Sequence, residues 1–186
     1  MASYLLAHDL GTSGNKATLF TTEGKLVEST VYSYGLKVSA GHHAEQNADD
    51  WWNAVCETTK LLIGKAGVSP KEVEAVSFSG HMMGCLCVDR DGVPVRDSLI
   101  WADLRSANEE EHIRKQISDE DYYRLTAQRL SASYGAPKFM WLKEHEPDTY
   151  RRTYKTLNAK DYIILRLTGN FVTDPSDASG VGLMNI

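Results

Sequence analysis

The first part of the chain has the apolar runs and short turns of consecutive β-strands. An apolar run at 4–8 leads into a turn at 11–14, and β-prone stretches follow at 16–21 and 26–34. Glu23-Gly24 separates the last two stretches. Three strands joined by such short turns predict an antiparallel meander. Its first turn is unusual because it is rich in glycine and hydroxyl groups.

Apolar residues then recur at helical spacing over 51–66, after a polar loop at 39–47. This stripe predicts an amphipathic helix with Trp51 in the core. Asn47 is positioned to cap its start, and Gly67 follows its last turn. The pattern indicates one long helix after the meander.

Strand patterns return after this helix. We expect a strand at 73–78, a short loop at 79–84, and a hairpin of 85–89 with 93–95. Asp91-Gly92 between the last two is a favourable hairpin turn.

The second half of the chain is predicted to be mostly helical. The expected helices are 104–117, 119–126, 137–145 and 159–167, with Gly169 ending the last one, and 171–186 is expected to form a loop and a short strand. The order of elements favours an α/β domain with a mixed sheet over a doubly wound fold, in which the first strand would lead directly into a helix. We expect residues 1–100 to form a β-rich part and residues 101–186 a mostly helical part.

Composition narrows the class of protein. The 186 residues are 42% hydrophobic and 24% charged, with a net charge of -5. Binders of nucleic acid concentrate lysine and arginine, so this balance argues against them. No apolar run approaches the length of a membrane span, and the N-terminus lacks the features of a signal peptide. We therefore expect a cytoplasmic protein without membrane or nucleic-acid partners.

The cysteines do not indicate a metal site. Cys85 and Cys87 alternate along one predicted strand, and Cys56 is distant from both in the sequence. No Cys-x-x-Cys pair and no His-Glu-x-x-His helix is present, although His42, His43 and His81 could supply nitrogen ligands. Buried, reduced cysteines are the favoured interpretation.

The turn from Asp9 to Gly14, Asp-Leu-Gly-Thr-Ser-Gly, has the chemistry of a phosphate-binding loop. Glycine lets the backbone approach a phosphate closely, and successive amides in a tight turn can bind an anion. Asp9 could hold Mg²⁺ directly or through water. The other expected phosphate contacts are Gly11, the hydroxyls of Thr12 and Ser13, and the charge of Lys16. Neither common nucleotide-binding fingerprint is present, and a glycine-rich hairpin turn alone is more often only a turn.

Other sequence stretches, together with this turn, resemble the motifs of a known protein family. The hairpin resembles the first phosphate motif of the actin, Hsp70 and sugar-kinase superfamily. Within it, the chain is similar to the FGGY carbohydrate kinases, most closely to their xylulokinase branch. The stretches that carry the resemblance are 44–47 with 50–52, 79–84, 101–105, 136–138 with 141–142, 160–162 with 167–169, and 173–180. They occur in family order over the whole chain.

The resemblance implies the N-terminal half of a two-domain, actin-like (ribonuclease H-like) ATPase fold and a phosphotransferase that uses ATP and Mg²⁺. In the family, an aspartate acts as general base on a sugar hydroxyl, which attacks the γ-phosphate. That aspartate, the second phosphate motif and the adenine pocket match positions beyond Ile186. We therefore expect a truncated N-terminal domain that is inactive alone. Asp174 and Asp177 are expected to cap turns rather than act as the base.

The resemblance also implies a set of sugar contacts. Relatives similar to xylulokinase carry Gln-Met-His where this chain has His81-Met82-Met83, so the family's substrate histidine falls on Met83. A thioether cannot replace the hydrogen bonds of an imidazole, so this difference weakens the inference of D-xylulose as the substrate without affecting the kinase assignment. The expected sugar-binding residues are His81, Met82, Met83, Trp101, Asp103 and Arg105.

Several of these residues also have plainer interpretations. Lys16 could point at solvent, and Met82 and Met83 could fill gaps in a core. Arg105 could form a surface ion pair with Asp103 or Glu109. The acidic run at 109–111 is interpreted as a solvated helix face.

Two other function classes remain open from the sequence. One is a non-catalytic actin-like nucleotide-binding module, and the other is a metal-dependent hydrolase that uses the histidines and cysteines. The favoured hypothesis is a carbohydrate kinase acting on a ketopentose or a related polyol, with a homodimer left open.

Overall fold

The computed structural model describes residues 3–185. Contacts divide the chain into two compact units, one of Met1–Gly35 with Asp49–His81 and one of Leu36–Ala48 with Met82–Ile186. Neither unit is a continuous segment, because the chain passes between them three times.

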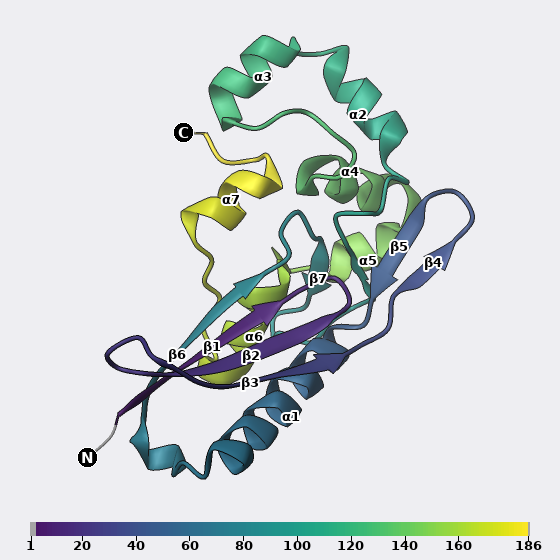
Figure 1. Ribbon diagram of the computed structural model, residues 1–186. Helices are drawn as coiled ribbons and strands as arrows, with labels where there is room; N and C mark the ends of the chain where they lie inside the picture. The colour runs from purple at the N-terminus through teal and green to yellow at the C-terminus, as the bar shows by residue number, and fades with distance from the viewer. Residues whose placement is uncertain (1–2, 186) are drawn as a thin grey trace. The chain divides into compact units, whose positions relative to one another are not determined.

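The first unit is built on a four-stranded sheet with the order β3-β2-β1-β6 (Figure 1). The strands are β1 (Tyr4–Leu10), β2 (Gly14–Thr21), β3 (Leu26–Ser33) and β6 (Val73–Gly80). The first three form the predicted antiparallel meander, and β6 pairs with β1 in parallel. The prediction of a mixed sheet is therefore confirmed.

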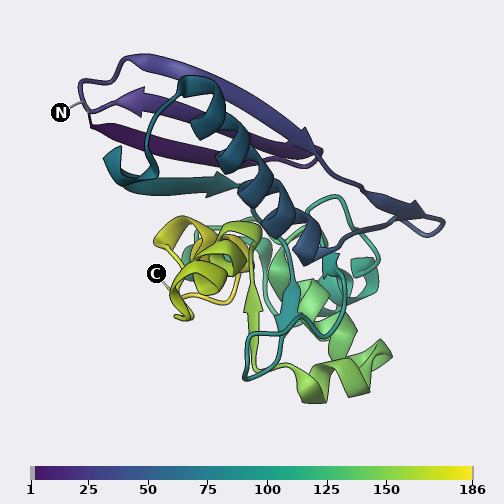
Figure 2. The same cartoon turned by 90° about the horizontal axis from the view of Figure 1, so that it is seen from below.

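Helix α1 (Ala48–Ala66) covers one face of this sheet (Figure 2). It begins directly after Asn47, as the sequence predicts. Alternate residues of β1 and β2 point at α1. Leu6, Ala17 and Leu19 of these strands form a core with Leu62 of α1 and with Val68, which follows the helix. A short 3-10 turn, Pro70–Glu72, then leads into β6. Burial of the helix's apolar stripe holds this layer to the sheet.

The second unit contains two small sheets. One has the order β4-β5-β8, with β4 (Lys37–Ser39), β5 (His43–Gln46) and β8 (Ser98–Leu99). The other pairs β7 (Leu86–Val88) with β9 (Lys155–Leu157).

The prediction of a loop at 39–47 is wrong, because β5 lies within it. Ala44 and Gln46 alternate inward, with 4% and 1% of their surface exposed. A buried glutamine conceals the strand pattern, since it counts as polar in the sequence.

Helices make up the rest of the second unit. They are α2 (Ala107–Arg114), α3 (Asp119–Thr126), α4 (Gly135–His145), α5 (Pro147–Arg152), α6 (Ala159–Thr168) and α7 (Pro175–Val181). The helices predicted at 119–126 and 159–167 are confirmed almost to the residue, and Gly169 ends α6 with a φ of 73°. The helix predicted at 104–117 is shorter than expected, and α5 was not predicted.

Helix α7 contradicts the strand expected in 171–186. Asp174 caps it, because its side chain accepts from the amides of Ser176 at 2.8 Å and Asp177 at 3.2 Å. Gly182 ends the helix with a φ of 73°. The cap expected of Asp174 is confirmed, whereas Asp177 is buried in an ion cluster. Ile186 lies outside the described residues.

A second core holds the strands of this unit together. It contains Cys85, Cys87, Leu99 and Leu142. All three cysteines are free. Cys85 and Cys87 are buried as expected, whereas Cys56 is only partly buried. Among residues 3–185, no helix combines the length and apolarity needed to cross a bilayer.

Candidate functional site

The turn between β1 and β2 is held in place by Tyr34, which directly follows β3. The Gly11 amide donates to the Gly14 carbonyl at 2.9 Å, and the Tyr34 amide donates to the Ser13 carbonyl at 3.2 Å. The Tyr34 hydroxyl donates to the Gly11 carbonyl. A Cβ on Gly14 would lie 2.7 Å from the Tyr32 carbonyl oxygen, so this position requires glycine. The turn is therefore pre-formed.

This geometry limits which groups of the turn face a phosphate. The Gly11 amide already closes the turn, so it does not serve as an anion donor in this conformation. Thr12 is half-buried and Ser13 is exposed. Contact of these two residues with a phosphate stays a prediction.

Asp9 and Lys16 lie opposite each other across β1 and β2, and Asp9 lies opposite Ser79 across β1 and β6. Both charged side chains are exposed. They line a groove of about 410 Å³ on the sheet, which also includes Ala7, His8, Thr18, Phe20, Ser77, Phe78 and Ser79. A carboxylate and an ammonium group thus share one open surface beside the glycine-rich turn. Burial and the nearby Asp9 carboxylate raise the pKa of Tyr34, so its hydroxyl stays protonated beside them.

A buried polar network lies under the turn. His8 Nδ1 lies 3.0 Å from Asn15 Nδ2, which donates to Thr58 Oγ1 at 2.8 Å. His8 Nε2 lies 3.3 Å from Thr59 Oγ1, and the ring stacks on Phe78. Burial lowers the pKa of His8 to about 4, although the Asn15 hydrogen bond opposes this. The neutral imidazole therefore links β1, β2 and α1 directly behind Asp9.

His81 continues the same unit beyond β6. Its amide donates to the Leu10 carbonyl at 2.8 Å, and its ring meets the Trp51 ring edge-on, with 5.3 Å between centroids. Trp51 is fully buried, which confirms its predicted place in the core. His81 thus ties the loop after β6 to the end of β1.

In the second unit, Lys138 organises the loop that follows His81. It is fully buried, and its ammonium donates to the carbonyls of Met83 at 2.8 Å, Ile100 at 2.7 Å, and Ser133. Burial lowers the pKa of Lys138 to about 8. Met83 has a φ of 62°, which is unusual for a residue with a side chain. The lysine therefore holds Met83 in a strained conformation.

The two methionines of this loop pack toward α7. A Cβ placed on Gly180 would lie 3.5 Å from Met82 Cε and 3.8 Å from Met83 Cγ. The Gly84 amide donates to Asn158 Oδ1 at 2.8 Å, which anchors the loop to the start of α6. These contacts agree with the interpretation of the methionines as packing residues. Their contact with sugar stays a prediction.

Trp101, Asp103 and Arg105 differ sharply in exposure. Trp101 is 42% exposed, whereas Asp103 is fully buried and accepts from the Ala44 amide at 2.7 Å. Arg105 Nε donates to Asp103 Oδ1 at 2.9 Å, and its Nη2 donates to Glu45 at 2.6 Å. Asp103 and Arg105 therefore brace the segment, and Trp101 is the most exposed of the three; the contact of all three with sugar stays a prediction.

Two interpretations of the charged residues are only partly correct. Arg105 does pair with Asp103, at 2.7 Å, but the pair is not at the surface, because the Arg105 side chain is 5% exposed and lies over the Trp141 ring at 4.9 Å. The run at 109–111 is not wholly solvated, because Glu109 is 4% exposed. The side of α2 that carries Glu109 packs against α4, which the local sequence does not reveal.

The described residues contain two groups of carboxylates and histidines that are close enough to share a metal ion: Glu109 with Glu144 and His145, and Asp161 with Asp174 and Asp177. Lys160 already lies in the second group, where its ammonium pairs with all three carboxylates. Its hydrogen bond holds the pKa of Asp174 well below its usual range, whereas burial raises the pKa of Asp177. Neither group includes a cysteine, in contrast to the hydrolase hypothesis.

Comparison with known families decides the classification. The model of the FGGY family of carbohydrate kinases, N-terminal domain, matches residues 4–186. The chain belongs to this family. The resemblance stated from the sequence motifs is thereby confirmed.

Relatives agree in fold but differ in sugar. A xylulose kinase of Staphylococcus xylosus is 34% identical over 184 residues, which are 99% of this chain and 38% of that relative. A gluconate kinase structure from Lactobacillus acidophilus aligns with a TM-score of 0.92 at 28% identity, covering 100% of this chain and 37% of that one. A ligand-bound xylulose kinase structure from the same organism aligns with a TM-score of 0.91 at 28% identity. This alignment covers 98% of this chain and 37% of that one. The chain thus spans little more than a third of these relatives.

Several supporting residues were not singled out from the sequence. His8 looks like an ordinary strand residue, and Glu45 like part of a polar loop. Lys138 carried a signal, because it stands in an apolar stretch at the start of a helix, where a lysine rarely lies without buried acceptors.

Proposed function

We propose that this chain is the part of an ATP-dependent carbohydrate kinase that holds the phosphates and forms part of the sugar pocket. The observation that supports this most is the family match over residues 4–186. The proposed reaction transfers the γ-phosphoryl group of ATP to a hydroxyl of a sugar or polyol in the cytoplasm.

On the nucleotide side, the pre-formed turn offers Thr12 and Ser13 to phosphate oxygens, while Lys16 supplies positive charge from the neighbouring strand. Pre-organised donors are effective because they need no rearrangement when charge develops in the transition state. The Tyr34 and Gly11 contacts keep the turn in this shape.

Asp9 fits the role of a magnesium contact. Its carboxylate is a hard oxygen donor, is exposed, and lies in the groove beside the phosphate turn. Mg²⁺ prefers such oxygens and often retains several waters, so direct or water-mediated contact would suit it. The ion, when bound, would neutralise phosphate charge. The role of Asp9 would be to position it.

On the sugar side, Trp101 offers an aromatic face, on which the C–H groups of a polyol pack well. Asp103 and Arg105 would act mainly by holding this segment in place. His81, Met82 and Met83 are proposed to border the sugar, and a ketopentose such as xylulose is the proposed substrate class. Met83 in place of the family's histidine would alter selectivity among sugars.

The test uses the full-length gene product, assayed with Mg-ATP and a panel of ketoses, polyols and sugar acids. We expect at least one substrate to stimulate ADP release. We expect Asp9→Ala to lower kcat/KM for Mg-ATP by about 100-fold, because the metal loses its positioning carboxylate. The KM for the sugar should change less than about threefold, because Asp9 contacts the nucleotide side.

Asp91→Ala is the matched control, since Asp91 is an exposed carboxylate in a surface turn. Asp91→Ala should leave kcat/KM for Mg-ATP and KM for the sugar near their wild-type values. Nucleotide binding without turnover on any sugar would favour the non-catalytic actin-like module. A larger effect of Asp9→Ala on sugar KM than on Mg-ATP would contradict the role given to Asp9.

A further inference from the structure

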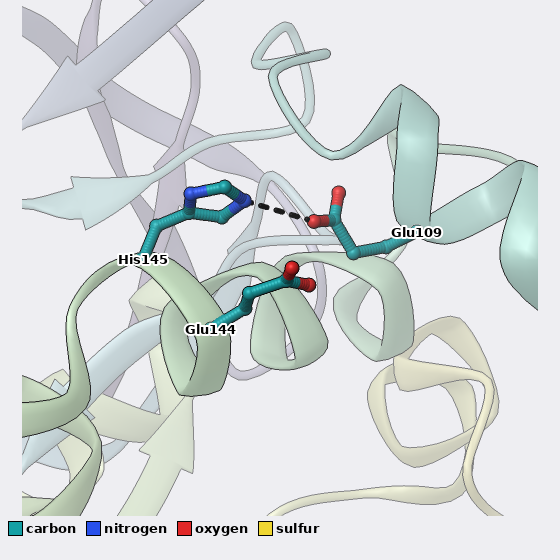
Figure 3. A group of neighbouring side chains, drawn as sticks. All are labelled: Glu109, Glu144 and His145. Atoms are coloured by element: carbon teal, nitrogen blue, oxygen red, sulfur yellow. Dashed lines mark hydrogen bonds and ion pairs between the residues drawn. The ribbon is translucent and has the colours of Figure 1, made fainter.

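Helices α2 and α4 bring together three side chains that the kinase chemistry does not use. Glu109 comes from α2, and Glu144 and His145 come from the end of α4 (Figure 3). One ligand atom from each lies within 4.8 Å of the others. They border a cavity of about 320 Å³, which is also lined by Asn108, His112 and Met140. Figure 3 shows the Glu109 and His145 side chains directed at each other, with Glu144 beside them.

Glu109 is the exceptional member of this group. Its side chain is 5% exposed, and its Oε1 lies 3.3 Å from His145 Nε2. Its other carboxylate oxygen, Oε2, is buried and has no hydrogen-bond partner. A buried carboxylate normally has every oxygen satisfied, because removing it from water is unfavourable. The cavity beside Glu109 is therefore a place where a cation would be stabilised.

We propose that Glu109, Glu144 and His145 form a binding site for a divalent transition metal ion of the zinc type. Zinc binds imidazole nitrogen and carboxylate oxygen at about 2.1 Å, so two ligands of a tetrahedral ion are about 3.4 Å apart. The distance of 3.3 Å between His145 Nε2 and Glu109 Oε1 matches this ligand–ligand separation. It is longer than a typical charge-assisted hydrogen bond.

The surroundings of the group favour this ion over magnesium or calcium. An imidazole ligand suits zinc, copper or nickel, whereas magnesium and calcium prefer sites made of oxygen. The His145 ring stacks on Trp141, with 5.0 Å between centroids, which orients its nitrogen toward Glu109. Glu144 is exposed and can complete the set by a change of rotamer. Three protein ligands leave a fourth position for water, and the ion would cross-link α2 to α4.

The test measures zinc binding to the 186-residue chain by calorimetry, with circular dichroism to verify folding. We expect one zinc ion per chain. Glu109→Gln and His145→Gln should each weaken binding by more than about tenfold, because each removes a ligand. Glu111→Gln is the matched control, since Glu111 is an exposed carboxylate on the same helix. It should change the affinity less than about twofold.

Two further measurements distinguish a specific zinc site from nonspecific binding of zinc to the protein surface. Cobalt should give the visible absorption of a tetrahedral nitrogen and oxygen site in the wild type but not in His145→Gln. Zinc should raise the Tm of the wild type and not that of Glu109→Gln. Absence of zinc binding in the folded wild type, or equal affinity in the folded wild type and both ligand variants, would overturn the proposal. Competition by equimolar magnesium would overturn the choice of metal.

Discussion

His8 is a buried histidine whose environment favours the neutral ring. Its side chain is packed against Phe78 and bonded to Asn15, and 2% of its surface is exposed. Burial lowers its pKa from 6.5 to about 4. Protonating the ring would place a positive charge in this buried position, where water cannot solvate it.

The depressed pKa makes folding sensitive to acid. Between pH 6.5 and about 4, the unfolded chain binds a proton at His8 that the folded chain does not, so stability falls as pH falls. Above pH 6.5 this contribution is fully present. We expect His8 to account for about 3 kcal/mol of stability lost between pH 7 and pH 4. Urea unfolding across this range measures the loss.

His8→Gln provides the comparison, because glutamine has no group that titrates in this range. The variant should be less stable at pH 7 by about 1–2 kcal/mol, since the hydrogen bonds fit less well. Its stability should then fall less steeply with acid than that of the wild type. Parallel pH profiles for the two proteins would contradict the assigned pKa.

At the scale of elements, α7 is secured at both ends. Lys160 at the start of α6 pairs with Asp174 and Asp177 at the beginning of α7. The Tyr122 hydroxyl of α3 donates to the Gly182 carbonyl at 3.0 Å, where α7 ends. A helix of this length has little stability of its own, so these contacts decide its position.

Lys160→Met should therefore destabilise the chain through α7. Without the ammonium, the buried carboxylates of Asp161 and Asp177 lose their counter-charge. We expect a loss of about 3–5 kcal/mol at pH 7, measured by urea unfolding. The pKa of each unpaired carboxyl would rise in the folded state. The deficit relative to the wild type should therefore shrink as pH falls and these groups bind protons.

Asp174→Asn is a milder comparison, since the Asp174 side chain is 42% exposed and remains able to cap α7 as asparagine. Asp174→Asn should lower the free energy of unfolding by less than half as much as Lys160→Met does. Equal losses for the two variants, or a deficit that does not change with pH, would count against the buried ion cluster as the cause.

At the scale of the whole molecule, the chain matches the N-terminal domain of the FGGY kinases over residues 4–186. It spans 38% of the Staphylococcus xylosus xylulose kinase and 37% of the Lactobacillus acidophilus gluconate kinase. Phosphoryl transfer requires groups on both sides of the triphosphate and a base near the attacking hydroxyl. The resemblance implies that the base matches a position after Ile186.

We therefore expect the 186-residue chain alone to show no sugar-stimulated turnover of ATP. A coupled assay of ADP release, run beside the full-length gene product under identical conditions, tests this. Circular dichroism must first show that the shorter chain is folded. Sugar-stimulated turnover by the folded shorter chain would contradict the expected place of the general base.

The sequence alone was enough to predict the elements whose pattern is local. The meander of β1 to β3, the long helix α1, and helices α3 and α6 each show their own periodicity and end signals over several residues. The motifs also predicted the family, which the match over 4–186 confirms. The turn between β1 and β2 was located because glycines and hydroxyls stand together in the chain, and its phosphate role stays a prediction.

Only the tertiary structure decided the features that depend on distant partners. β5 pairs with β8 across a long stretch of sequence, and strands so short carry no period of their own. Glu109 is buried because α4 covers its side of α2, and Lys138 finds its carbonyl acceptors in three separate segments. Local patterns reflect which way a side chain tends to face. Burial, pKa and ligand geometry depend on which other segments pack against it, and that is determined only when the whole domain folds.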